Sequence, residues 1–170
     1  MREIIFRGKA VIDFEREQVF EFWEREVLKN GDWIQGDLIW NNGTPFIVHG
    51  VIEDNDEYIS LEWWVPVAPE TIGQYTGLTD KNCKKIFEGD IYRVINNGKT
   101  LETLFEIRFL HGAFCAAPVR RDDEDFVPLE WIGNEDEPDD SAYFFDYAAH
   151  GLQFEVIGNI HDNPELLENK

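Results

Sequence analysis

The chain has 170 residues, of which 43% are hydrophobic and 14% aromatic, a composition that suits a single domain with a substantial apolar core. It carries 15 Lys and Arg against 35 Asp and Glu, a formal net charge of −20 at pH 7. This charge disfavours direct binding to nucleic-acid phosphates and to anionic membrane surfaces, because both need clustered Lys and Arg.

The two cysteines, Cys83 and Cys115, form neither a disulfide framework nor a zinc-binding spacing. The first residues, MREIIFRGKAVIDFERE, are charged throughout and contain no apolar segment typical of a signal peptide. No apolar run approaches the length of a membrane span. We therefore expect a soluble, reduced protein of the cytoplasm, without a membrane partner.

The N-terminal part predicts one strand followed by one helix. The apolar run at residues 3–7 predicts a strand that Gly8 and Lys9 interrupt. Between residues 14 and 30, apolar side chains recur at spacings of three and four, which is the period of an amphipathic helix. Asn30 and Gly31 then provide a helix end, since Gly accepts the left-handed conformation after the last turn.

From residue 32 onward the pattern is mostly β. Short strands are expected at residues 33–40, 46–52, 58–67, 91–95, 101–109, 113–119 and 153–161. The Asn-Gly dipeptides at 42–43 and 97–98 favour tight hairpins. Trp63 and Trp64 are adjacent in one expected strand, so their rings should point to opposite faces, one into the core and one outward.

Residues 120–140 differ in composition from the rest of the chain. This segment holds ten of the 35 acidic residues, and the apolar stretch FVPLEWI lies between its two acidic runs. We interpret it as an acidic insert, since blocks of like charge repel and tend to stay solvated. Its carboxylates lack the ligand spacing of a calcium loop.

No catalytic, cofactor-binding or metal-binding residue can be assigned from motifs. The chain lacks a nucleophile elbow, a phosphate-binding glycine loop, a zinc-protease helix and an EF-hand. The four histidines have no ligand-like spacing, and Cys115 lies in an apolar context typical of an inert thiol. We therefore expect no cofactor.

Four blocks of sequence carry a resemblance to a known family. They are REIIFRGK at 2–9, GDWIQGDLI at 31–39, PETIGQYTGLTDKNCKKIFEGDI at 69–91 and EVIGNIHDNPELL at 155–167. In these blocks the chain resembles the YopX family of phage and prophage proteins. Cys83 departs from the family, which usually has Gly there, and the stretches at 15–29 and 120–140 look like additions. The resemblance implies a β-rich fold and a phage or prophage origin, and it supplies no reaction.

We therefore predict a mainly β fold built as one YopX-like domain over residues 1–170. A small SH3-like barrel should form its core, with added strands and the helix near 14–30. Glu88-Gly89-Asp90 before an apolar strand is common in such barrels. The segment around Asp80-Lys81-Asn82-Cys83 suits a hairpin turn, and loops on rigid scaffolds often carry sites. The candidate interaction loop comprises Gln74, Tyr75, Thr76, Asp80 and Lys81.

Three hypotheses about function follow from these observations. The first is a non-enzymatic interaction module of phage or prophage origin that binds a protein partner, with a basic partner favoured by the charge. The second is an acidic decoy that occupies a host DNA-binding protein. The third is an enzyme whose site is assembled from distant residues, with Asp80, Glu88, Asp90 or Cys83 as candidates. The high aromatic content and the many strand edges also predict a homo-oligomer.

Overall fold

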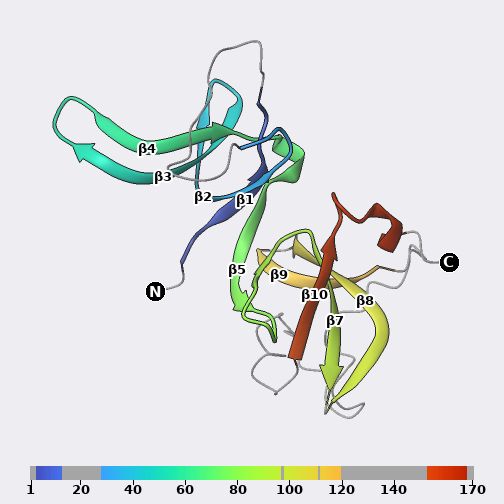
Figure 1. Cartoon of the computed structure of the whole chain (residues 1–170). Coiled ribbons are helices and arrows are strands. Elements are labelled where there is room, and N and C mark those ends of the chain that lie inside the picture. The colour runs from blue at the N-terminus through green and yellow to red at the C-terminus, as the bar shows by residue number, and fades with distance from the viewer. Residues whose placement is uncertain (1–2, 13–27, 97, 111, 120–152, 168–170) are drawn as a thin grey trace. The chain divides into compact units, whose positions relative to one another are not determined.

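The computed structural model describes residues 3–12, 28–96, 98–110, 112–119 and 153–167. These residues are mainly β, as the sequence predicts, and the chain divides into two compact units, Met1–Tyr75 and Thr76–Lys170 (Figure 1). None of the helices among the described residues has the length and apolarity that a membrane span requires.

The first unit is built on an antiparallel sheet with the strand order β4-β3-β2-β1-β5. Its elements are β1 (Phe6–Lys9), β2 (Trp33–Asn41), β3 (Thr44–Asp54), β4 (Ile59–Pro66), the short 3-10 helix η1 (Pro69–Thr71) and the start of β5 (Gly73–Thr79). β2 changes partner along its length, because its first half pairs with β1 and its second half with β3. The Asn42-Gly43 turn joins β2 to β3 with φ angles of 49° and 82°, which confirms the predicted hairpin.

The core of this unit lies on one face of the sheet. Its buried members are Ala10, Ile34, Ile47, Val65 and Val67. Ile47 lies directly opposite Val65 in the β3–β4 register, so the two side chains share a face. The predicted split of the tryptophan pair is confirmed, since Trp63 packs against this cluster and Trp64 is exposed.

The second unit contains a four-stranded antiparallel sheet with the order β10-β7-β8-β9. Its strands are β7 (Asp90–Asn96), β8 (Lys99–Leu110), β9 (Ala113–Pro118) and β10 (Gln153–Asn159). Short β6 (Lys85–Phe87) precedes them, and the 3-10 helix η3 (Pro164–Leu167) follows them.

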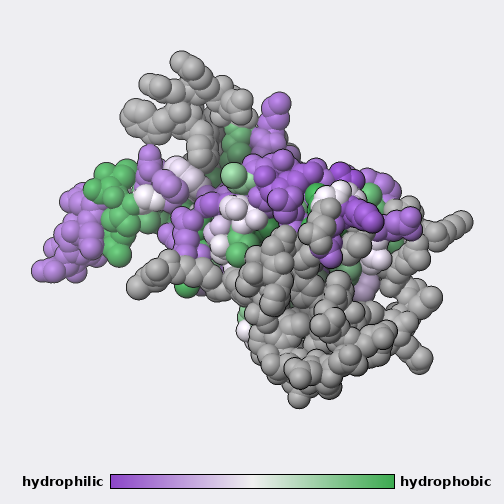
Figure 2. Space-filling view, turned by 90° about the horizontal axis from the view of Figure 1, so that it is seen from below, coloured by the Kyte–Doolittle hydropathy of each residue, from purple (hydrophilic) through white to green (hydrophobic). Residues whose placement is uncertain are grey.

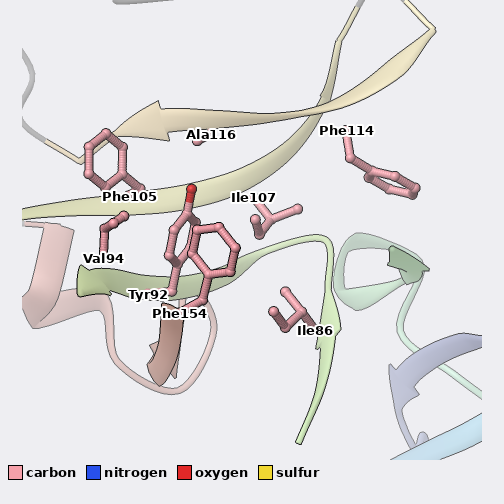
Figure 3. Packing of buried hydrophobic residues seen from close by; sticks show 8 residues of the cluster. All are labelled: Ile86, Tyr92, Val94, Phe105, Ile107, Phe114, Ala116 and Phe154. Atoms are coloured by element: carbon pink, nitrogen blue, oxygen red, sulfur yellow. The ribbon is translucent and has the colours of Figure 1, made fainter. Parts of the chain in front are cut away.

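One apolar cluster joins the strands of this second unit. It follows the period of two, so that every other residue of β7, β8 and β9 points the same way (Figure 3). Tyr92 occupies the centre, with its ring stacked near Phe105 and edge-on to Phe154 at a centroid distance of 5.4 Å. The cluster consists of Ile86, Tyr92, Val94, Phe105, Ile107, Phe114, Ala116 and Phe154.

The structure does not bear out the predicted barrel or the predicted break in the first strand. The SH3-like barrel is not confirmed, because the described strands form antiparallel sheets and no closed barrel. The predicted break at Gly8 and Lys9 is wrong, since both residues lie inside β1. Gly8 belongs there because an added Cβ would lie 2.9 Å from the Cβ of Val67. The predicted helix at 14–30 falls mostly on residues 13–27, which lie outside the described residues, and residues 28–30, which are described, are not helical. The acidic insert at 120–140 also lies outside the described residues.

Candidate interaction surfaces

The predicted turn around Asp80 is a compact element fixed by one carboxylate. Oδ1 of Asp80 accepts hydrogen bonds from the backbone N–H groups of Asn82 (2.8 Å) and Lys84 (2.9 Å). Oδ2 accepts a third bond from the N–H of Val156 on β10, at 3.3 Å. The Asp80 N–H itself donates to the Lys84 carbonyl at 2.8 Å. One side chain therefore closes the turn and attaches it to a strand far along the chain.

These donors also set the protonation of Asp80. Burial of the carboxyl group raises its pKa, but the N–H groups of Lys84, Asn82 and Val156 together lower the pKa below the ordinary 3.8. Asp80 is therefore ionised at neutral pH and is already occupied by backbone donors. This is the arrangement of a structural carboxylate, and it leaves little capacity for a general acid or base.

The structure separates the five residues of the predicted interaction loop by exposure. Tyr75, Thr76 and Asp80 are buried, and Gln74 is half-buried on β5. The Thr76 hydroxyl donates to the Ile86 carbonyl at 2.9 Å, which ties β5 to β6. Lys81 is the exposed member of the set. The role of these five residues in binding a partner stays a prediction. Gln74 and Lys81 have the side chains most accessible to a partner.

Lys81 belongs to a small charged cluster on the second unit. Its Nζ lies 3.0 Å from Oε1 of Glu155, and Nε of Arg93 donates to Oε2 of the same carboxylate at 2.6 Å. The hydrogen bond from Lys81, followed by that from Arg93, lowers the pKa of Glu155 below its ordinary value. The carboxylate of Glu155 is shared by the two cations, so it offsets one of their two positive charges.

The remaining candidates for chemistry occupy turns or strand interiors. Cys83 is exposed and adopts a φ of 63°, the left-handed conformation that Gly accepts most easily. Burial raises the pKa of the Cys115 thiol, which lies 3.7 Å from the Ala113 carbonyl. Asp90 is buried, and its Oδ2 accepts the N–H of Phe87 at 2.9 Å, which fixes the turn containing half-buried Glu88. Among the described residues, no group of three or more His, Cys, Asp and Glu side chains could hold a metal ion.

A second surface, which the sequence interpretation missed, lies on the first unit. Figure 2 shows an apolar area over the hairpin of β3 and β4, next to the hydrophilic tip of that hairpin. Seven of the ten large hydrophobic side chains exposed among the described residues come from β2, β3, β4 and the turn between β3 and β4. The alternation of strand side chains distributes these residues over both faces of the hairpin strands, and we call them together the β2–β4 surface: Ile39, Trp40, Val51, Ile52, Tyr58, Ile59 and Trp64.

Within the sequence span that contains the β2–β4 surface, the Lys, Arg, Asp and Glu charges have one sign. The sequence contains no Lys or Arg from residue 30 to residue 80, a span that includes all of β2, β3 and β4. The same span contains carboxylates on β2, on β4 and above all at the β3–β4 turn, where Glu53, Asp54, Asp56 and Glu57 follow each other closely. The sequence signal that could have identified the surface has two parts. One is the absence of Lys and Arg from residues 30–80, and the other is the apolar residues on both sides of an acidic turn.

These features define a class of protein: a mainly β chain with antiparallel sheets, turns closed by side chains and an exposed apolar surface with acidic surroundings. Residues 13–168 match the family described as YopX protein, and the chain belongs to the YopX family. Among solved structures it is similar to the crystal structure of protein EF1440 from Enterococcus faecalis, at 23% identity and a TM-score of 0.47, with 98% of this chain and 99% of that chain covered. No curated protein sequence matches this chain.

Proposed function

We propose that the chain is a phage- or prophage-derived interaction module that binds a protein partner through the β2–β4 surface. The single observation that supports this function is the concentration of exposed large hydrophobic residues on three adjacent strands. Exposed apolar patches with polar surroundings mark contact sites on soluble proteins, and here exposed apolar side chains lie on both faces of the β3–β4 hairpin. Membership of the YopX family agrees with this proposal without specifying a partner.

The residues available for catalysis favour this function over an enzyme. Asp80 and Asp90 are both buried and both accept backbone hydrogen bonds that shape turns. An enzymatic role would need one of these carboxylates to exchange its N–H donors for a substrate. The decoy hypothesis remains a special case of the interaction module, in which the partner is a DNA-binding protein.

Site-specific photo-crosslinking tests the proposed function. A benzoylphenylalanine residue replaces Trp64 of the β2–β4 surface, and in a matched control it replaces Phe109 of β8. The two aromatic side chains are similarly exposed, at 45% and 47%. In cells of the organism that encodes the chain, we expect the Trp64 probe to give a discrete heavier adduct and the Phe109 probe to give none. Equal adducts from both probes, or none from Trp64, would contradict binding through this surface.

A further inference from the structure

The outer part of the β3–β4 hairpin, residues 49–61, forms an arm of only two strands. β2 pairs with β3 from Thr44 to Val48, whereas β3 and β4 continue to pair as far as Asp54 and Ile59. Among the described residues, the arm therefore has no third strand beside it. A two-stranded ribbon is marginally stable alone, since it has too little apolar surface to bury.

Apolar side chains occupy one face of this arm. Val51 lies directly opposite Leu61, and Leu61 shares its face with Ile59 two residues earlier on β4. Val51 and Ile59 are 63% and 62% exposed, and Ile52, at the shift of register in β3, is 68% exposed. The hydrophobic effect stabilises β-branched side chains at this degree of exposure only when another surface covers them.

The tip of the arm is an acidic turn closed by its own side chains. Oδ1 of Asn55 accepts the N–H groups of Glu57 (2.9 Å) and Tyr58 (3.1 Å), which closes the turn. The Tyr58 hydroxyl donates to Oε2 of Glu53 at 2.9 Å, and the Asn55 amide donates to Oε1 at 3.3 Å. A tip held by its own side chains loses little conformational entropy when a partner binds.

From these observations we infer that the arm docks a cationic amphipathic segment of the partner protein, and this inference rests on the proposed function. The apolar face formed by Val51, Leu61 and Ile59 receives the partner's apolar side chains. The carboxylates of Asp54, Asp56 and Glu57 pair with its Lys and Arg, since no Lys or Arg lies between residues 30 and 80 to neutralise them. A second copy of the chain is a poorer occupant, because it would bring another acidic tip.

Three peptides of equal length test the chemistry of the occupant against the full chain. They alternate Leu with Lys, Leu with Glu, and Ser with Lys, and their affinities are measured by fluorescence anisotropy at physiological salt. We expect the Leu-Lys peptide to bind at least about tenfold more tightly than the other two, since it alone matches both the apolar face and the charge. Its affinity should fall as salt rises.

Paired variants locate the binding on the arm. Val51→Thr with Ile59→Thr removes apolar contacts but keeps β-branched residues, and its control is Val11→Thr with Ile4→Thr, at positions that are also exposed. Asp56→Asn with Glu57→Gln removes two charges, and its control is Glu102→Gln with Glu165→Gln, exposed residues of the second unit. Each arm variant should weaken the Leu-Lys peptide on the order of fivefold or more, and each control by less than about twofold.

The outcomes separate the two proposals. If the Ser-Lys peptide binds as well as the Leu-Lys peptide, or if the controls weaken binding as much as the arm variants, the contact is general charge attraction and the inference is overturned. If the Leu-Glu peptide binds equally well, or no peptide binds, the cationic occupant is rejected while a Trp64 adduct in cells still supports the interaction module. Self-association lost in the Val51→Thr, Ile59→Thr variant, without peptide binding, would assign the arm to a second copy.

Discussion

Asp80 illustrates how one residue links a turn to a distant strand, and its ionisation makes the link depend on pH. The pKa of Asp80 in the folded chain lies below its ordinary value. Its contribution to the free energy of unfolding is therefore fully present above the pKa of the unfolded chain, and it is lost as pH falls through the pKa of the folded chain. Asp80→Asn should lower the free energy of unfolding at pH 7 by about 1.5–3 kcal/mol, as expected for bonds to a charged group. The deficit should shrink at pH 3.

Urea unfolding of the wild type and the variant at both pH values checks this effect. Asp37→Asn serves as a control, because Asp37 is exposed on β2 and should show little change at either pH. A deficit of the same size at pH 7 and at pH 3 would show that the charge of Asp80 has no part in the stability.

Cys83 adopts a left-handed backbone conformation that is unfavourable for a residue with a Cβ. A φ of 63° costs a residue with a Cβ about 1 kcal/mol relative to Gly. Cys83→Gly should therefore raise the midpoint of thermal unfolding, whereas Cys83→Ala, which keeps the Cβ, should not. Scanning calorimetry under reducing conditions measures both, and an equal gain for Ala would assign the effect to the thiol instead of the backbone.

At the scale of elements, Gly36 controls how β2 passes from one partner strand to the next. It pairs with Phe6 of β1, and the following residue, Asp37, already pairs with Val48 of β3. A Cβ at position 36 would lie 2.3 Å from the Val48 carbonyl oxygen, which is backbone and cannot move away easily. Gly36→Ala should therefore destabilise the chain by about 1–3 kcal/mol or more.

Chemical denaturation of Gly36→Ala and of Gln35→Ala provides the comparison. Gln35 is an exposed neighbour on the same strand, so its truncation should stay within about 0.5 kcal/mol of the wild type. If Gly36→Ala and Gln35→Ala change the free energy of unfolding equally, the close approach of β2 and β3 does not require a glycine at position 36.

Local elements were predictable because their causes are local. The Asn42-Gly43 turn follows from two residues that accept positive φ, and the alternation of β7 and β8 follows from the period of two. The pairing of Phe6 with Gln74, or of Val94 with Phe154, joins segments far apart in the chain, and no short pattern encodes it. The barrel was inferred from the local motif at Glu88-Gly89-Asp90, and that motif fixes one turn without determining how a sheet closes.

The candidate site was only partly predictable for the same reason. The role of Asp80 as a turn former was readable from its neighbours, but its bond to the Val156 N–H was not. The sequence analysis places Thr76 and Asp80 in an interaction loop, whereas their burial follows from contacts that only the folded chain reveals. Conversely, Val51 and Ile59 read as ordinary strand residues, because their exposure depends on β3 and β4 extending beyond β2.

At the scale of the whole molecule, net charge and apolar surface oppose each other in self-association. The sequence predicts a homo-oligomer, and the exposed β2–β4 surface offers apolar contacts for one, yet a net charge of −20 repels a second copy. Screening decides the balance, since the Debye length is about 8 Å at physiological salt and about 3 Å at 1 M. We therefore expect association to increase with salt.

Light scattering coupled to size exclusion measures this dependence at a fixed, high micromolar protein concentration. The wild-type chain should have a mass close to the monomer's 19.9 kDa in low salt and a higher mass in 1 M NaCl. The variant Val51→Thr, Ile59→Thr should keep the monomer mass at both salt concentrations, because it lacks the apolar side chains that would join two copies once salt screens their repulsion. The control variant Ile4→Thr, Val11→Thr should show the same masses as the wild type. If the mass rises with salt equally in both variants, the contact between copies lies away from the arm. If the mass of the wild type falls with salt, ion pairs and not apolar side chains hold the copies together.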